Sequence, residues 1–157
     1  MTGSTELDEV SLRIEATPEQ VWDLLSDITR MPEWSPAMAK CLWRGKVREP
    51  VVGARFIGVN KPGIPTPNRI ERAERGREFT FRVTLHNTVW RYLLTPDGDG
   101  TVVTEQRDTS GTRHGILWPL YKLVGGREQF ARNFRKGMER TLHRLKEVAE
   151  SPGHGAR

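Results

Sequence analysis

Three polar residues, Tyr92, Glu105 and Arg107, stand at positions where strand periodicity turns side chains towards a protein interior. Successive side chains of a strand point to opposite faces, so an inward Val103 would place Glu105 and Arg107 on the inner face as well. Two opposite charges on such a face must pair or meet a ligand, because an unpaired buried charge is costly. We therefore treat this group as a candidate polar site.

The chemistry of Glu105 depends on its surroundings. Burial would raise its pKa unless Arg107 lies close enough to stabilise the carboxylate. A neutral Glu105 can act as an acid and an ionised one as a base, for example in enolisation or dehydration of a poly-keto substrate. Tyr92 can donate a hydrogen bond to a ligand carbonyl. Three alternatives stay open: a bulge or a position at the mouth would leave both charges solvated, an inward Val102 would reverse the parity, and Tyr92 could be an ordinary core tyrosine.

The segments around these residues predict an antiparallel sheet. Short stretches of alternating apolar and polar residues are separated by Gly and Pro turns, of which Pro96 to Gly100 gives the strongest hairpin signal. The stretches lie too close together for crossover helices, so neighbours must pair in antiparallel fashion. The predicted strands are 10–16, 38–44, 54–60, 68–73, 77–83, 89–95 and 101–109, with a stiff loop over 61–67.

Helices are predicted at both ends of this sheet. Thr17 can cap a short helix that Pro18 begins and to which Gln20 reaches back, and a second short helix or turn follows at 31–36. From 117 to 150 apolar residues recur every three or four positions, which is typical of a long amphipathic helix that the glycines at 125 and 126 kink or divide. Gly137 in the interior of this helix lowers the stability of the helix by about 1 kcal/mol relative to alanine.

Three stretches resemble a known family. They are ATPEQVWDLLSDITRMPEWSP (16–36), VWRYLLTPDGDGTVVTEQRD (89–108) and GGREQFARNFRKGMERTLHRLKEVAE (125–150). Together they resemble the START-like superfamily, which is also called SRPBCC, in particular its polyketide cyclase/dehydrase branch. The resemblance implies an α+β helix-grip fold, with a curved antiparallel sheet of about seven strands wrapped on a long C-terminal helix and two short helices after the first strand. It also implies one domain over 1–150, followed by a flexible tail over 151–157.

In such a fold, a cavity between sheet and helix would hold a small, largely apolar ligand. The predicted anchors are Glu105, Arg107 and Tyr92, of which Glu105 and Tyr92 are the catalytic candidates. Trp34 and Ile64 would lie near one rim of the cavity and gate it. The remaining predicted wall residues are Phe79, Phe81, Trp90, Leu94, Phe134 and Met138.

Two classes of function follow. The first is a binder or carrier of a lipid, a polyketide or a similar hydrophobic metabolite, which we favour because no His or Cys has an obvious partner. The second is a polyketide aromatase/cyclase or dehydratase, a lyase or isomerase in which Glu105 is the general acid or base. The chain contains no metal-ligand spacing, phosphate loop or dinucleotide fingerprint, so we expect no metal and no cofactor.

Composition limits the remaining possibilities. The 157 residues include one cysteine, Cys41, and no signal-like apolar stretch, so we expect a soluble cytoplasmic protein that is a monomer or a homodimer. The formal net charge is +5 and the pI about 9.8. The cationic excess lies on the predicted C-terminal helix, which leaves binding of nucleic acid or an anionic membrane by that helix as a minor alternative to a merely solvated face.

Overall fold

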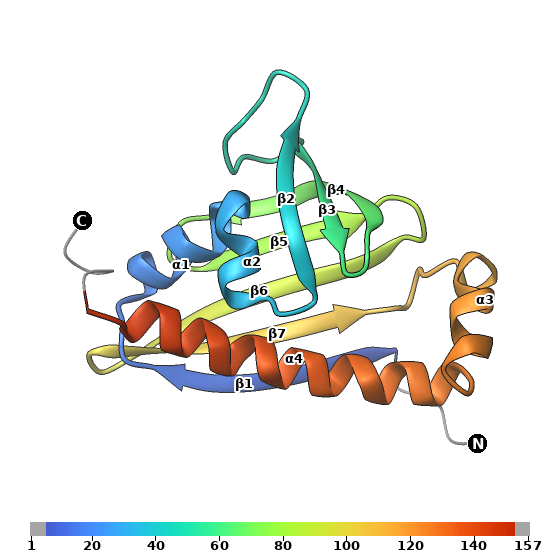
Figure 1. Ribbon diagram of the computed structural model, residues 1–157. Helices are drawn as coiled ribbons and strands as arrows, with labels where there is room; N and C mark the ends of the chain where they lie inside the picture. The colour runs from blue at the N-terminus through green and yellow to red at the C-terminus, as the bar shows by residue number, and fades with distance from the viewer. Residues whose placement is uncertain (1–5, 153–157) are drawn as a thin grey trace.

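The computed structural model describes residues 6–152 as one seven-stranded sheet with its covering helices (Figure 1). The strands are β1 (Leu7–Ile14), β2 (Met38–Arg44), β3 (Arg55–Asn60), β4 (Ile64–Glu74), β5 (Glu78–Val83), β6 (Thr88–Asp97) and β7 (Gly100–Asp108). The helices are α1 (Pro18–Ser26), the short 3-10 helix η1 (Ile28–Arg30), α2 (Met31–Trp34), α3 (His114–Leu123) and α4 (Arg127–Glu150).

All neighbouring strands pair antiparallel, in the order β1-β7-β6-β5-β4-β3-β2. This arrangement, with the long C-terminal helix α4, confirms the predicted helix-grip α+β fold. The chain pairs its first strand with its last, so that β1 closes the sheet beyond β7. The C-terminal helix then lies along β1, while α1 and α2 lie further across the sheet (Figure 1).

The strand β4 differs most from its predicted length. β4 begins at Ile64, so most of the predicted loop over 61–67 belongs to the strand. Its prolines, Pro65 and Pro67, pair with β3, whereas β5 pairs with β4 only from Asn68 onwards. Proline is tolerated there because this end of β4 has no second neighbour that needs the missing N–H.

The first helix begins as the sequence predicts. The Thr17 side chain accepts a hydrogen bond from the Gln20 backbone, and the Gln20 side chain accepts one from the Thr17 backbone, which completes a capping box. Trp22 from this helix donates its indole N–H to the carbonyl of Glu78 on β5 at 3.0 Å. The bond from Trp22 ties α1 to the sheet.

The C-terminal helical region consists of two helices. Gly125 and Gly126 have φ of +96° and +113°, which glycine adopts readily, and they separate α3 from α4. The buried side chains of α4 all lie after Gly137, at Met138, Thr141, Leu142, Leu145 and Ala149. Three of these join the main hydrophobic core, which also contains residues of β1, α1, α2 and the central strands.

Gly137 does not mark a close approach of α4 to a strand. A Cβ built on this residue meets no atom within 4 Å, so the helix tolerates the cost of a glycine here. Among residues 6–152, no helix has both the length and the apolar character needed to cross a membrane. Most of the tail predicted over 151–157 lies outside the described residues.

Candidate functional site

The register of β7 settles which of its residues face inwards. Val103 has no exposed surface, and Glu105 and Arg107 on the same face are only 2% and 5% exposed. Pairing between β6 and β7 continues without a shift from Val89 to Asp97, so there is no bulge. Val102 is only half-buried and faces the other way. The inward orientation of the two charges, which the sequence left open, is therefore established.

Glu105 pairs across the strands with Tyr92, and their side chains meet. The Tyr92 hydroxyl donates a hydrogen bond to Oε2 of Glu105 at 2.8 Å. Burial raises the pKa of Glu105 from 4.5 to about 8, although the bond from Tyr92 acts in the opposite direction. Burial and the neighbouring Glu105 also raise the pKa of Tyr92. Both groups are consequently neutral at pH 7.

Two residues that contact Tyr92 each have a buried polar atom with no hydrogen-bond partner within the described part of the chain. These atoms are Oε1 of Glu105 and the indole Nε1 of Trp34. The Trp34 ring packs edge-on against the Tyr92 ring, with centroids 5.7 Å apart. Buried polar atoms are rarely left unpaired, so each of these atoms marks a place where a further polar group would be stabilised.

Trp34 therefore lies in the interior and not at a cavity rim. Its side chain has no exposed surface, because the short helix α2 packs it between the sheet and the C-terminal helix. Ile64, the second predicted gate residue, is 47% exposed at the start of β4. The two residues differ completely in burial, so they do not form a common rim.

Arg107 pairs with a residue that the sequence analysis missed. Its Nη1 atom lies 2.9 Å from Oδ2 of Asp8, its register partner on β1. The sequence prediction started this strand at Val10. Asp8 lies on the same face as Val10, Leu12 and Ile14, so extending the alternation by two residues would have placed Asp8 on the inner face. Burial lowers the pKa of Arg107, while Asp8 partly offsets this effect.

The guanidinium of Arg107 also lies over two aromatic rings of α4. Its Cζ atom is 4.6 Å from the Phe134 centroid and 5.7 Å from that of Phe130. Phe134 in turn lies 5.8 Å from Trp90 on β6. These three aromatic side chains are only half-buried, so this end of the inner face borders on solvent. Phe130 is a second contact that the sequence analysis did not include.

The other predicted wall residues are more deeply placed. Those with less than a tenth of their surface exposed are Phe79, Phe81, Leu94 and Met138. Phe79 and Phe81 lie 5.9 Å apart, and Phe81 packs edge-on against Phe56 of β3 at 5.3 Å. Cys41 is buried as well, and burial raises its pKa to about 12, which keeps it a thiol.

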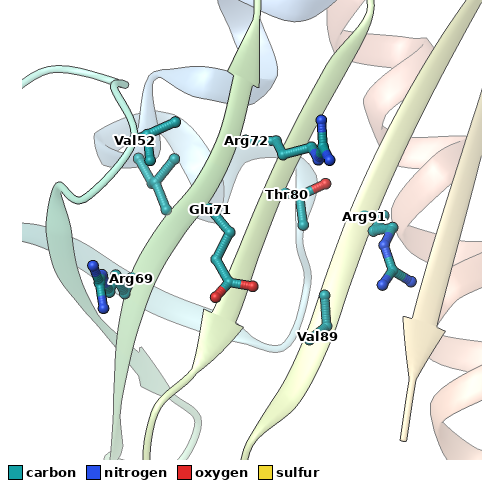
Figure 2. Close-up of a pocket in the computed structure, with 8 residues that line it drawn as sticks. Val52, Arg69, Glu71, Arg72, Thr80, Val89 and Arg91 are labelled. Atoms are coloured by element: carbon teal, nitrogen blue, oxygen red, sulfur yellow. The ribbon is translucent and has the colours of Figure 1, made fainter. Parts of the chain in front are cut away.

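A pocket of about 390 Å³ opens on the opposite, outer face of the sheet (Figure 2). Figure 2 places Glu71, Thr80 and Arg91 on three adjacent strands, with Val52 from the loop before β3 beside them. Glu71 is held by Arg82 through two bonds of 2.9 Å, and Arg91 pairs with Asp108 at 3.0 Å. None of the predicted site residues lines this pocket, so it is not the predicted cavity.

Comparisons with known proteins agree with this architecture. Residues 9–150 match the sequence model of the family described as polyketide cyclase/dehydrase and lipid transport. No curated protein sequence matches the chain. The solution structure of a polyketide-cyclase-like protein, Cgl2372 from Corynebacterium glutamicum, is 32% identical to it, with a TM-score of 0.65 over 95% of this chain and 94% of that one.

More distant structures share the fold. A START superfamily protein from Mycobacterium smegmatis has a TM-score of 0.71 at 14% identity, over 92% of this chain and 97% of that one. DynU16, a putative protein of the dynemicin biosynthetic locus, has a TM-score of 0.66 at 16% identity, over 93% of this chain and 48% of that one.

The chain therefore belongs to the polyketide cyclase/dehydrase and lipid transport family of START-like proteins. The functions associated with this family and fold are binding of hydrophobic ligands and polyketide-cyclase-like chemistry.

Proposed function

We propose that the protein binds a small, largely apolar molecule between the sheet and α4, with an oxygen of that molecule bound near Tyr92, Glu105 and Trp34. The observation that carries this proposal is the two buried, unpartnered polar atoms on residues that contact Tyr92. A protonated Glu105 and the indole N–H of Trp34 are both hydrogen-bond donors, and a carbonyl oxygen accepts two. A ligand carbonyl would therefore accept hydrogen bonds from these two buried groups, which have no partner in the fold.

The half-buried end of the inner face is the proposed route of entry. Trp90, Phe130 and Phe134 meet there around the guanidinium of Arg107. Arg107 and Glu105 are two residues apart on one face of a strand, about 7 Å along its axis. A ligand that enters between the aromatic rings would thus meet a paired charge first and the neutral Glu105 behind it.

A second candidate function is an aromatase/cyclase or dehydratase. The observation that favours it is the raised pKa of Glu105, about 8, because a general acid or base works best when its pKa is near the working pH. Glu105 would transfer a proton to or from the ligand, and Tyr92 would hold the carboxyl group in place. Binding alone requires only that Glu105 donate a hydrogen bond.

Native mass spectrometry of the purified chain, with a search for a co-purifying small molecule, tests the binding function. We expect a bound apolar molecule in the wild type and much less of it in Phe134→Ala. Arg69→Gln is the matched control, since Arg69 lines the outer pocket and should leave the bound molecule unchanged. Equal retention by all three proteins would contradict binding at the inner face.

Glu105→Gln separates the two functions. If the protein is a carrier, the variant keeps a neutral hydrogen-bonding side chain and retains most of the affinity for the captured molecule. If it is an enzyme, the variant binds a poly-keto substrate but loses turnover, because an amide cannot exchange the proton. Equal turnover in the wild type and the variant would exclude Glu105 as the acid or base.

A further inference from the structure

The helix α3 exposes apolar side chains that a folded domain normally buries. Its inward residues, Leu117 and Tyr121, are buried, and the Tyr121 ring packs at 4.9 Å against Phe130 of α4. Four further apolar residues of the helix are exposed. The side chains of Ile116, Trp118, Leu120 and Leu123 are 42%, 58%, 36% and 81% exposed. Such a concentration of exposed apolar residues marks an interaction surface.

Cations lie in and beside this helix, within a segment that is flanked by Asp108 and Glu128. Residues 109–127 contain Arg113, Lys122 and Arg127 and not one Asp or Glu. Within residues 6–152, none of these three side chains takes part in an ion pair. The surface therefore combines apolar side chains with free positive charge, which is complementary to an anionic partner.

The position of α3 leaves this surface accessible. Figure 1 shows α3 at one end of the molecule, beyond the end of β7 and crosswise to α4. It is joined to α4 through Val124, Gly125 and Gly126. At 100° per residue, Ile116 and Leu123 lie on the side of the helix that faces away from Leu117 and Tyr121, and Trp118 and Leu120 lie on the two opposite flanks of that side. A flat partner can reach this face without displacing any part of the sheet.

We propose that α3 docks onto the surface of an anionic phospholipid membrane. Ile116 and Leu123 enter the interfacial layer, with Trp118 and Leu120 at its edges on either flank of the helix, and Arg113 and Lys122 pair with the anionic headgroups. A second copy of the chain fits this surface less well, because a two-fold contact through α3 would bring the cations of both copies together. The proposal is independent of ligand binding at the inner face, because binding to lipid vesicles requires no ligand there.

Co-sedimentation of the full chain with vesicles tests this docking. We expect binding to phosphatidylcholine vesicles that contain phosphatidylglycerol, weaker binding to phosphatidylcholine alone, and weakening by added salt. Leu120→Ser with Leu123→Ser should reduce the affinity about tenfold or more, because two apolar side chains no longer contact the lipid. Both residues are exposed, so the fold should tolerate the change. The matched control is Leu42→Ser with Val52→Ser, two residues that are 49% and 66% exposed elsewhere on the molecule and should have no effect.

The charges are tested in the same way. Arg113→Gln with Lys122→Gln should weaken binding to anionic vesicles about fivefold for each charge removed. The control pair Lys40→Gln with Lys46→Gln should not. Glu105→Gln should bind vesicles like the wild type, which separates a failure of this proposal from a failure of the inner-face function.

Three results would overturn the proposal. The first is no sedimentation with anionic vesicles. The second is equal binding by the α3 variants and their controls. The third is a lipid-independent dimer, detected by analytical ultracentrifugation, that the Leu120 and Leu123 substitutions dissociate. This last result would mean that the exposed face of α3 is the interface with a second copy of the chain.

Discussion

The two halves of α4 face different surroundings. From Met138 onwards the helix buries five side chains, and Leu142, Leu145 and Ala149 join the apolar core. Before Gly137 no side chain is fully buried, and Phe130 and Phe134 lie half-exposed around a buried charge. The difference shows that one helix can stabilise the fold with one half and leave the aromatic side chains of the other half partly exposed.

The largest expected difference concerns large-to-small substitutions in the two halves. Leu145→Ala should lower the free energy of unfolding by about 3 kcal/mol, because it leaves a cavity in the closed core. Phe134→Ala should cost about half as much, since part of this ring is already in contact with water. Urea denaturation of both variants measures the difference. Equal costs would mean that the first half of α4 is as much a structural element as the second.

The ion pair between Asp8 and Arg107, at the half-buried end of the inner face, should give the next largest effect on stability. Asp8→Ala removes the partner of Arg107, which is almost fully buried, and should cost about 2 kcal/mol of stability. Asp23 makes an equally short contact, 2.8 Å, with Arg75, but both side chains are more than half exposed. Asp23→Ala should therefore change the stability by less than about 0.5 kcal/mol. Similar costs for both substitutions would contradict the burial of Arg107.

Glu105 should give the protein a distinctive pH dependence. Between its ordinary pKa of 4.5 and its folded value of about 8, the folded state holds a proton that the unfolded chain releases. The wild type should therefore lose stability as the pH rises through this window, by roughly 1.4 kcal/mol per pH unit relative to Glu105→Gln. Chemical denaturation of both proteins at several pH values measures this slope. A constant difference between them would mean that Glu105 is already ionised in the fold.

The smallest effect is expected at the boundary between the two halves. Gly137→Ala should stabilise the protein by about 0.7 kcal/mol, since alanine is the better helix former and its Cβ would meet no atom within 4 Å. Gly76→Ala should do the opposite, because Gly76 has φ of +79° and a Cβ there would lie 2.8 Å from Glu19. Thermal unfolding of the two variants compares them. A loss of stability in Gly137→Ala would indicate that the glycine is required for packing.

Local patterns predicted most of the architecture. Alternation within 101–109 put Glu105 and Arg107 on the same face as Val103, and Thr17 with Gln20 predicted the first helix cap. These features depend on residues a few positions apart, where the backbone geometry is known in advance. The same reasoning divided the C-terminal region at Gly125 and Gly126.

Contacts between distant residues could not be predicted in this way. Arg107 pairs with Asp8, which lies 99 positions earlier, because the first strand closes the sheet beside the last. The burial of Trp34 requires α2 to pack against the C-terminal helix, which no spacing within 31–36 reveals. The exposure of Trp118 and Leu123 likewise depends on where α3 leaves the sheet.

The amino-acid sequence by itself determined that neighbouring strands pair antiparallel, the family and the orientation of side chains within each strand, because periodicity and turn chemistry act over short distances. Only the tertiary structure decided which charges are paired, which polar atoms lack partners and which apolar residues stay in water. Those properties depend on how separate elements pack together, and packing is a sum over contacts between residues far apart along the chain.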